Sequence, residues 1–127
     1  MARIILAEDD EIVAEIARDA LMAAGHGVGI LSDGAEALRV IRARRPDLVI
    51  LDCNMPELSG LLVLRAMRDS PDLHAIPVMV LTARDSRRDE EIAFYEGADD
   101  YMRKPFEPEE LVFRVEELLG RNRKAPA

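Results

Sequence analysis

The sequence predicts an α/β domain in which a parallel sheet is covered by helices on both faces. Short apolar runs alternate with helix-like patterns five times along the chain, and the links between them are short. Such alternation is typical of parallel sheets with right-handed crossover helices. The run Leu48–Leu51 consists of four branched aliphatic residues, which indicates a strand buried on both faces.

Each predicted strand is a short, mainly apolar run bounded by polar or turn-forming residues. The second strand is the weakest, because Gly29 lies within it, and the fifth strand is short. The predicted strands are Ile4–Ala7, Val28–Leu31, Leu48–Leu51, Val78–Leu81 and Asp100–Arg103.

The predicted helices carry apolar residues at helical spacing between capping and breaking residues. Asp10 and Ser59 are expected N-caps, and Pro108 suits the first turn of the last helix. The first three helices are expected to follow Asp10, Gly34 and Ser59 and to end near Gly25, Pro46 and Pro71. The last two are expected to begin at about Ser86 and at Pro108, and to end at Glu96 and Leu119.

Length and composition point to one globular domain. The chain has 127 residues, of which 49% are hydrophobic and 33% charged, and this excludes a disordered chain. Cys53 is the single cysteine, which excludes an internal disulfide and fits a reducing compartment. No apolar stretch is long enough to cross a membrane and no signal peptide is evident, so we expect a cytoplasmic protein. The net charge of -8 argues against direct nucleic-acid binding.

Acidic residues follow two of the predicted strands. Glu8 and Asp9 come directly after the first strand, and Asp52 ends the third. Open α/β sheets bind their ligands outside the carboxyl ends of the strands. Several carboxylates gathered there require a cation, so the pattern predicts a magnesium site that contains a potential nucleophile.

The chain resembles the receiver domains of two-component response regulators, the family of the chemotaxis protein CheY. The resemblance rests on Ile5–Asp10, Pro46–Asp52, Met55–Gly60, Leu81–Ala83 and Gly97–Phe106. It implies the flavodoxin-like sheet order 2-1-3-4-5, in which the first and third strands are neighbours. It covers residues 1–120 as the receiver domain and leaves 121–127 as a basic tail or the start of a linker.

The resemblance also implies a phosphoryl acceptor. Asp52 would take a phosphoryl group from a sensor histidine kinase or a histidine phosphotransfer protein. Asp9 and Asp52 would bind Mg²⁺ directly, Asn54 through its backbone carbonyl, and Glu8 through water. Such a domain is a phosphoacceptor that loses its phosphoryl group by hydrolysis, and it is not a turnover enzyme.

Three further residues receive roles through the resemblance. Lys104 and Thr82 would contact phosphoryl oxygens, and Thr82 and Tyr101 would move together to alter the face formed by the fourth helix, fifth strand and fifth helix. That face would signal to a protein target or to an output domain absent from this chain. The Lys104–Pro105 peptide bond is expected to be cis.

Several of these residues also have simpler interpretations. Glu8 and Asp9 could form a turn, Thr82 and Tyr101 could be ordinary strand residues, and Lys104 a solvated lysine. Cys53 is interpreted as a packed thiol. We interpret His26 and His74 as loop residues, since neither has a partner at ligand-like spacing.

Two departures from the family pattern affect oligomerisation and the site. Glu90 lies where transcriptional relatives have a basic residue facing Glu110, although Asp100 and Arg114 match their pattern. We therefore assume no symmetric dimer and expect a monomer or a weak phosphorylation-dependent dimer. Arg84, two residues after Thr82, borders the site and has no assigned role.

Two alternative functions are compatible with the same acidic residues. A magnesium-dependent phosphohydrolase also uses a strand-end aspartate, but it commonly has a second aspartate where this chain has Asn54, which cannot act as an acid. A receiver that only docks other proteins, without phosphorylation, is the other alternative. Such receivers usually lose part of the acidic pair, the aspartate or the lysine, all of which are present here.

Overall fold

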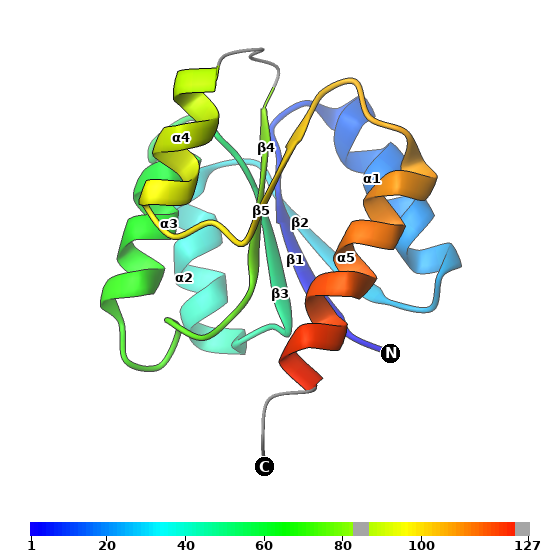
Figure 1. Ribbon diagram of the computed structural model, residues 1–127, viewed down its shortest axis with the longest axis horizontal. Coiled ribbons are helices and arrows are strands. Elements are labelled where there is room, and N and C mark those ends of the chain that lie inside the picture. Colours follow the sequence, from blue (N-terminus) through cyan, green and yellow to red (C-terminus); the bar gives the residue numbers. More distant parts are fainter. Residues whose placement is uncertain (83–86, 124–127) are drawn as a thin grey trace.

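The computed structural model describes residues 1–82 and 87–123. Arg84, the expected helix start at Ser86 and the last residues of the basic tail, 124–127, lie outside the described residues. Strands and helices alternate along the chain (Figure 1). Their bounds are β1 Arg3–Ala7, α1 Glu11–Ala23, β2 Gly27–Leu31, α2 Gly34–Arg44, β3 Leu48–Asp52, α3 Gly60–Asp69, β4 Val78–Thr82, α4 Arg87–Tyr95, β5 Asp100–Arg103 and α5 Pro108–Arg123.

The five strands form one parallel sheet in the order β2-β1-β3-β4-β5, which confirms the predicted fold class and strand order. β1 and β3 are neighbours, with Ala7 opposite Leu51. The residues that follow these two strands therefore leave the sheet at the same edge. This register positions the candidate site.

The helices cover the two faces of the sheet (Figure 1). α1 and α5 lie on one face, and α2, α3 and α4 lie on the other. Alternate residues of the central strand β3 enter the two cores, Leu48 and Ile50 on the α1/α5 side and Val49 and Leu51 on the opposite side. All four are fully buried, as the apolar run predicts.

Polar residues cap the N-termini of α1 and α3 at the positions that the sequence predicts. The Asp10 carboxylate accepts hydrogen bonds from the backbone N–H groups of Ile12 and Val13, and the Ser59 hydroxyl accepts one from Leu62. These caps satisfy donors that a helix N-terminus leaves unpaired. Gly25 adopts a φ of 96° just after α1, which explains why the helix stops there.

Some boundaries differ from those predicted. β2 begins at Gly27, since its backbone pairs with Arg3 in spite of the two glycines. α5 continues beyond Leu119 to Arg123, so the first residues of the basic tail are helical. His26 lies in a loop as expected, yet it is buried, because its ring contacts the Ala2 N–H and the Glu116 carboxylate.

None of the helices in the described ranges is both long and apolar enough to cross a membrane.

Candidate functional site

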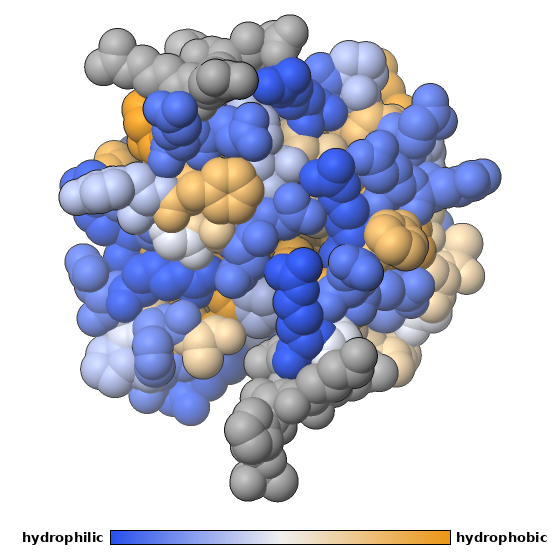
Figure 2. Space-filling model, in the orientation of Figure 1, coloured by the Kyte–Doolittle hydropathy of each residue, from blue (hydrophilic) through white to orange (hydrophobic). Residues whose placement is uncertain are grey.

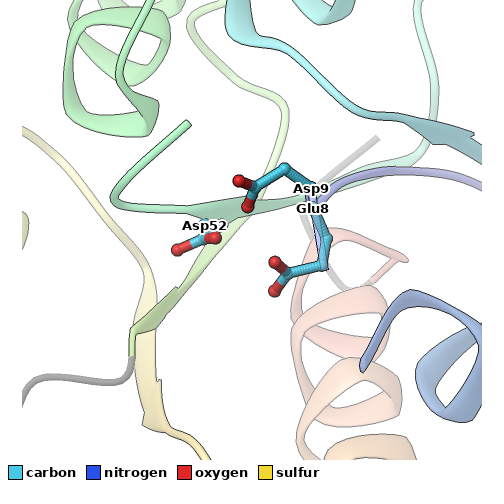
Figure 3. A group of neighbouring side chains, drawn as sticks. All are labelled: Glu8, Asp9 and Asp52. Carbon is cyan, nitrogen blue, oxygen red and sulfur yellow. The ribbon is translucent and has the colours of Figure 1, made fainter. Parts of the chain in front are cut away.

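Three carboxylates meet at the carboxyl edge of the sheet. Glu8 and Asp9 follow β1 and Asp52 ends β3, and each offers a carboxylate oxygen within 4.8 Å of the others. Figure 3 shows these side chains converging from the two neighbouring segments. The strand register brings them together, because parallel neighbours end at the same edge. The structure thus brings together Glu8, Asp9 and Asp52, the three acidic residues that the sequence pattern singled out.

Lys104 supplies a positive charge to this group. Its Nζ lies 2.8 Å from Glu8 Oε1 and 3.4 Å from Asp52 Oδ2. The backbone N–H of Lys104 donates to the Thr82 carbonyl over 2.7 Å, which holds the segment after β5 against the end of β4. The lysine side chain is only 14% exposed, so this ion pair is poorly screened by solvent.

The surroundings shift the pKa of two groups. Burial raises the pKa of Asp52, and its contact with Glu8 raises it further, against the opposing effects of the Asn54 N–H and Lys104. Burial alone would lower the pKa of Lys104, but the hydrogen bond to Glu8 and the charge of Asp52 outweigh it and raise that pKa. The fold thus holds Lys104 firmly as a cation beside a carboxylate that is costly to ionise.

The two acids after β1 have different environments. Glu8 is 1% exposed, and its second oxygen accepts the backbone N–H of Asp10 over 3.1 Å. Asp9 is exposed at the rim of the site. Glu8 is therefore held by protein donors, whereas Asp9 faces solvent and is available to a ligand.

Close backbone packing holds Asp52 in place. The Asn54 N–H donates to Asp52 Oδ1 over 3.2 Å, and the Gly60 N–H donates to the Cys53 carbonyl over 3.2 Å. A Cβ at Gly60 would lie 2.0 Å from the backbone oxygen of Asp52, so only glycine allows α3 to begin this close to β3. The requirement for glycine at position 60 was not predicted, although a glycine directly after the helix cap Ser59 is a signal in the sequence.

The donor set suits a hard divalent cation. Among the described residues, Glu8, Asp9 and Asp52 offer only oxygen ligands, and the exposure of Asp9 and Asn54 leaves room for water. Mg²⁺ prefers carboxylate oxygens and usually keeps several water ligands. The residues present therefore fit Mg²⁺.

Thr82 and Tyr101 lie on the neighbouring strands β4 and β5. Both residues are buried, Thr82 at the end of β4 and Tyr101 opposite Val80. Because side chains alternate along a strand, Thr82 and Tyr101 are on the same face of the sheet. The Lys104–Pro105 peptide bond is cis, as the resemblance implies.

The sequence matches the family described as "Response regulator receiver domain" over residues 4–116. The chain belongs to this family, whose members are receiver domains of two-component signalling systems. The match covers nearly all of the sheet and both helical layers.

Two named relatives are similar along almost the whole chain. The response regulator MprA of Mycobacterium leprae is 43% identical over 95% of this chain and 52% of its own length. The DNA-binding response regulator MtrA of Mycolicibacterium smegmatis is 39% identical over 98% of this chain and 54% of its own length. The chain thus spans about half the length of these curated relatives.

Solved structures agree with the fold. The receiver domain of the Francisella response regulator 1452 has a TM-score of 0.89 and 31% identity, covering 95% of this chain and 98% of that one. The receiver domain of the Pseudomonas aeruginosa sensor histidine kinase PA1611 has a TM-score of 0.87 and 29% identity, covering 94% and 98%. The PA1611 structure has a magnesium ion coordinated in its active site cleft.

Proposed function

We propose that this receiver domain accepts a phosphoryl group on Asp52 from a phosphohistidine of a sensor histidine kinase or a histidine phosphotransfer protein. The observation that carries the proposal is the position of Asp52, beside two further carboxylates and a lysine ammonium. An aspartate at a ligand-binding edge, with a cation beside it, has the arrangement of a nucleophile for phosphoryl transfer.

In the transfer, an Asp52 carboxylate oxygen attacks phosphorus and forms a P–O bond. The P–N bond to the histidine breaks, and the imidazole nitrogen keeps the electron pair and takes up a proton. The product is an acyl phosphate, which water later hydrolyses. Mg²⁺ bound by Asp9, Asp52 and the Asn54 carbonyl, with Glu8 acting through water, would neutralise charge on the phosphoryl oxygens.

Lys104 and Thr82 would contact the oxygens of the transferred phosphoryl group. The Lys104 ammonium contacts Asp52 and Glu8, which supports its contact with an oxygen of a group attached to Asp52. It would offset the added negative charge as a compact cation. The Thr82 hydroxyl would donate to another phosphoryl oxygen.

The phosphoryl group would act on the protein through Thr82 and Tyr101. A hydrogen bond that exists only when Asp52 is phosphorylated biases a two-state equilibrium toward one arrangement of these side chains. Their shared face of the sheet supports such coupling. The output is a changed surface on α4, β5 and α5, and the domain is a phosphoacceptor rather than a turnover enzyme.

The domain would work in the cytoplasm together with a kinase and a downstream protein. Its named relatives are about twice as long, and one is described as DNA-binding. This supports a receiver that controls an output domain or an equivalent partner protein, while nucleic-acid binding would belong to that output part.

Intact mass after incubation with acetyl phosphate or phosphoramidate tests the proposal. We expect one added phosphoryl group per chain, dependent on Mg²⁺ and absent in Asp52→Asn. Asp10→Asn is the matched control, because Asp10 caps α1 beside the site and asparagine caps a helix equally well. This control is expected to be phosphorylated like the unaltered protein.

The other outcomes separate the alternatives. A folded protein that binds Mg²⁺ but gains no mass from either donor would contradict the proposal and favour a docking receiver. Sustained turnover of a phosphate monoester would instead favour a phosphohydrolase.

A further inference from the structure

A hollow lies between α4, β5 and the start of α5. Its volume is about 470 Å³, within the usual range of ligand-sized pockets, and it opens on the face seen in Figure 2. That face is mostly hydrophilic, with separate apolar groups between the charged ones. We refer to this feature below as the α4–β5–α5 hollow.

Aromatic residues provide the apolar part of the hollow. Phe94 of α4, Tyr101 of β5 and Phe106 of the following segment line it. Phe94 is 46% exposed although it is large and apolar, and Phe106 is partly buried. Partly exposed aromatic rings beside a concavity are typical anchor sites for a partner's apolar side chain.

The rim of the hollow is acidic. Four carboxylates line it, from Glu90, Asp100, Glu107 and Glu110, against two guanidinium groups. Among the described residues the rim therefore carries a net negative charge, and Glu107 has no ion-pair partner within that part of the chain.

Both guanidinium groups are already bound to carboxylates of the same chain. Arg114 contacts Asp100 at 3.1 Å and Glu110 at 3.0 Å, and it also donates to the Tyr101 carbonyl. Arg103 lies 3.6 Å from Glu90. Glu90, Asp100 and Glu110 thus share the two guanidinium groups, so the described rim keeps two more carboxylates than guanidinium groups.

This charge pattern opposes pairing with a second copy. A two-fold symmetric interface that pairs α4 of one copy with α5 of the other would bring Glu90 toward Glu110, and like charges brought together at an interface cost binding energy. A partner with the opposite charge has no such penalty. The apolar floor requires that this partner also carry large apolar side chains.

We propose that the α4–β5–α5 hollow binds a cationic, amphipathic protein segment, in which Lys or Arg side chains flank one or two large apolar residues. The apolar residues would enter among Phe94, Tyr101 and Phe106, and the cations would meet Glu107 and Glu110. This inference rests on the proposed function, since Tyr101 both lines the hollow and belongs to the proposed switch. Phosphorylation would therefore change the affinity for the segment.

The test uses a short helical peptide with one leucine- and phenylalanine-bearing face and lysines on the other. Binding is followed by ¹⁵N chemical shifts, with and without acetyl phosphate and Mg²⁺, and intact mass reports phosphorylation separately. One comparison peptide has glutamate for lysine, and another keeps the lysines but has serine for the apolar residues. We expect only the first peptide to perturb α4, β5 and the start of α5.

Two double variants with the same net charge make the test specific. Glu107→Gln with Glu110→Gln should weaken binding about fivefold, since each rim charge contributes modestly. Glu15→Gln with Glu117→Gln removes as much charge from exposed sites outside the hollow, and binding should change by less than about twofold.

Several results would overturn the inference. These are equal weakening by both double variants, equal binding of the serine peptide, or a tight dimer of the phosphorylated protein whose ¹⁵N chemical shifts map its interface to the hollow. If the peptide binds as expected but no phosphoryl group is ever added, the proposed function fails and the docking site stands. If phosphorylation succeeds without altering peptide affinity, the link to Tyr101 is wrong.

Discussion

Glu8 and Lys104 form the most buried charge contact at the candidate site. The Glu8 side chain is fully buried and that of Lys104 is 14% exposed, with 2.8 Å between their charged atoms. A buried carboxylate is tolerated because a cation and backbone donors replace its water. The pair therefore stabilises the folded protein only while both members are present.

Lys104→Gln is expected to destabilise the fold by about 3 kcal/mol at neutral pH, because it leaves Glu8 buried without its cation. Urea denaturation measures this free energy of unfolding. Adding Glu8→Gln to the variant should restore much of the loss. An unchanged stability of the single variant would contradict the proposed role of this ion pair.

The ionised carboxylate of Asp52 destabilises the folded state when no metal cation is bound. Burial raises its pKa, which means that folding disfavours the ionised carboxylate. Asp52→Asn removes that charge from a similar volume, so we expect a more stable protein in metal-free buffer. Thermal unfolding in EDTA measures the change, and a less stable variant would contradict the expectation.

At the level of secondary structure, α3 depends on a glycine at its first position. A Cβ at Gly60 would lie 2.0 Å from the Asp52 backbone oxygen, and the backbone there belongs to the central strand β3. α3 and β3 cannot move apart without disturbing the core on that face of the sheet. The contact between α3 and β3 therefore leaves no room for a side chain at position 60.

Gly60→Ala is expected to cost at least about 2 kcal/mol in the free energy of unfolding, because overpacking against backbone is poorly relieved. Gly120→Ala in α5 is the matched control. Nothing lies within 4 Å of a Cβ there, and alanine favours a helix interior, so that variant should gain roughly 0.5–1 kcal/mol. Equal effects of the two changes would show that steric contact is not the cause.

An ion pair connects α3 to the end of α4. Nε and Nη2 of the Arg65 guanidinium group donate to the Glu96 carboxylate, over 2.9 and 2.7 Å. This hydrogen bonding lowers the pKa of Glu96. A lowered pKa adds stability that is present above the unfolded-state pKa and is lost as the pH falls through the folded-state pKa.

Arg65→Gln should therefore raise the pKa of Glu96 toward its usual value, as measured by carbon NMR titration of the carboxyl group. The stability difference from the unaltered protein should shrink as the solution is acidified. Arg42→Gln, at an exposed position of α2, is the control and should leave the Glu96 titration unchanged.

At the scale of the whole molecule, a bound cation would connect β1 and β3. A ligand that binds only the folded state stabilises it by mass action, by about 2.7 kcal/mol at one hundred times its dissociation constant. Mg²⁺ should therefore raise the unfolding temperature, and EDTA should reverse the effect. The Asp9→Asn variant should respond much less, and an equal response would place the ion elsewhere.

Much of this architecture was predictable from the sequence, for physical reasons. Fully buried strands such as Leu48–Asp52 leave a continuous apolar run, and caps such as Asp10 are local, so both can be seen in a short window. The strand order came from the resemblance rather than from the pattern. The convergence of Glu8, Asp9 and Asp52 then followed from the adjacency of β1 and β3.

Long-range contacts were the part that the sequence did not reveal. The burial of His26 depends on Glu116 of α5, the need for Gly60 depends on how closely α3 approaches β3, and Lys104 pairs with Glu8 as well as Asp52. The α4–β5–α5 hollow arises from three elements at once. No local sequence pattern encodes these distances.

The Glu8–Lys104 contact has a consequence for the protein's biosynthesis. Its two partners are separated by 96 positions in the chain. During synthesis from the N-terminus, the acidic residues after β1 and β3 emerge well before their lysine. A growing or truncated chain that ends before Lys104 thus contains the prospective acceptor without the cation that balances it. The proposed acceptor site would therefore be complete only when nearly the whole domain has been made. Fragments that end before Lys104 would not be phosphorylated.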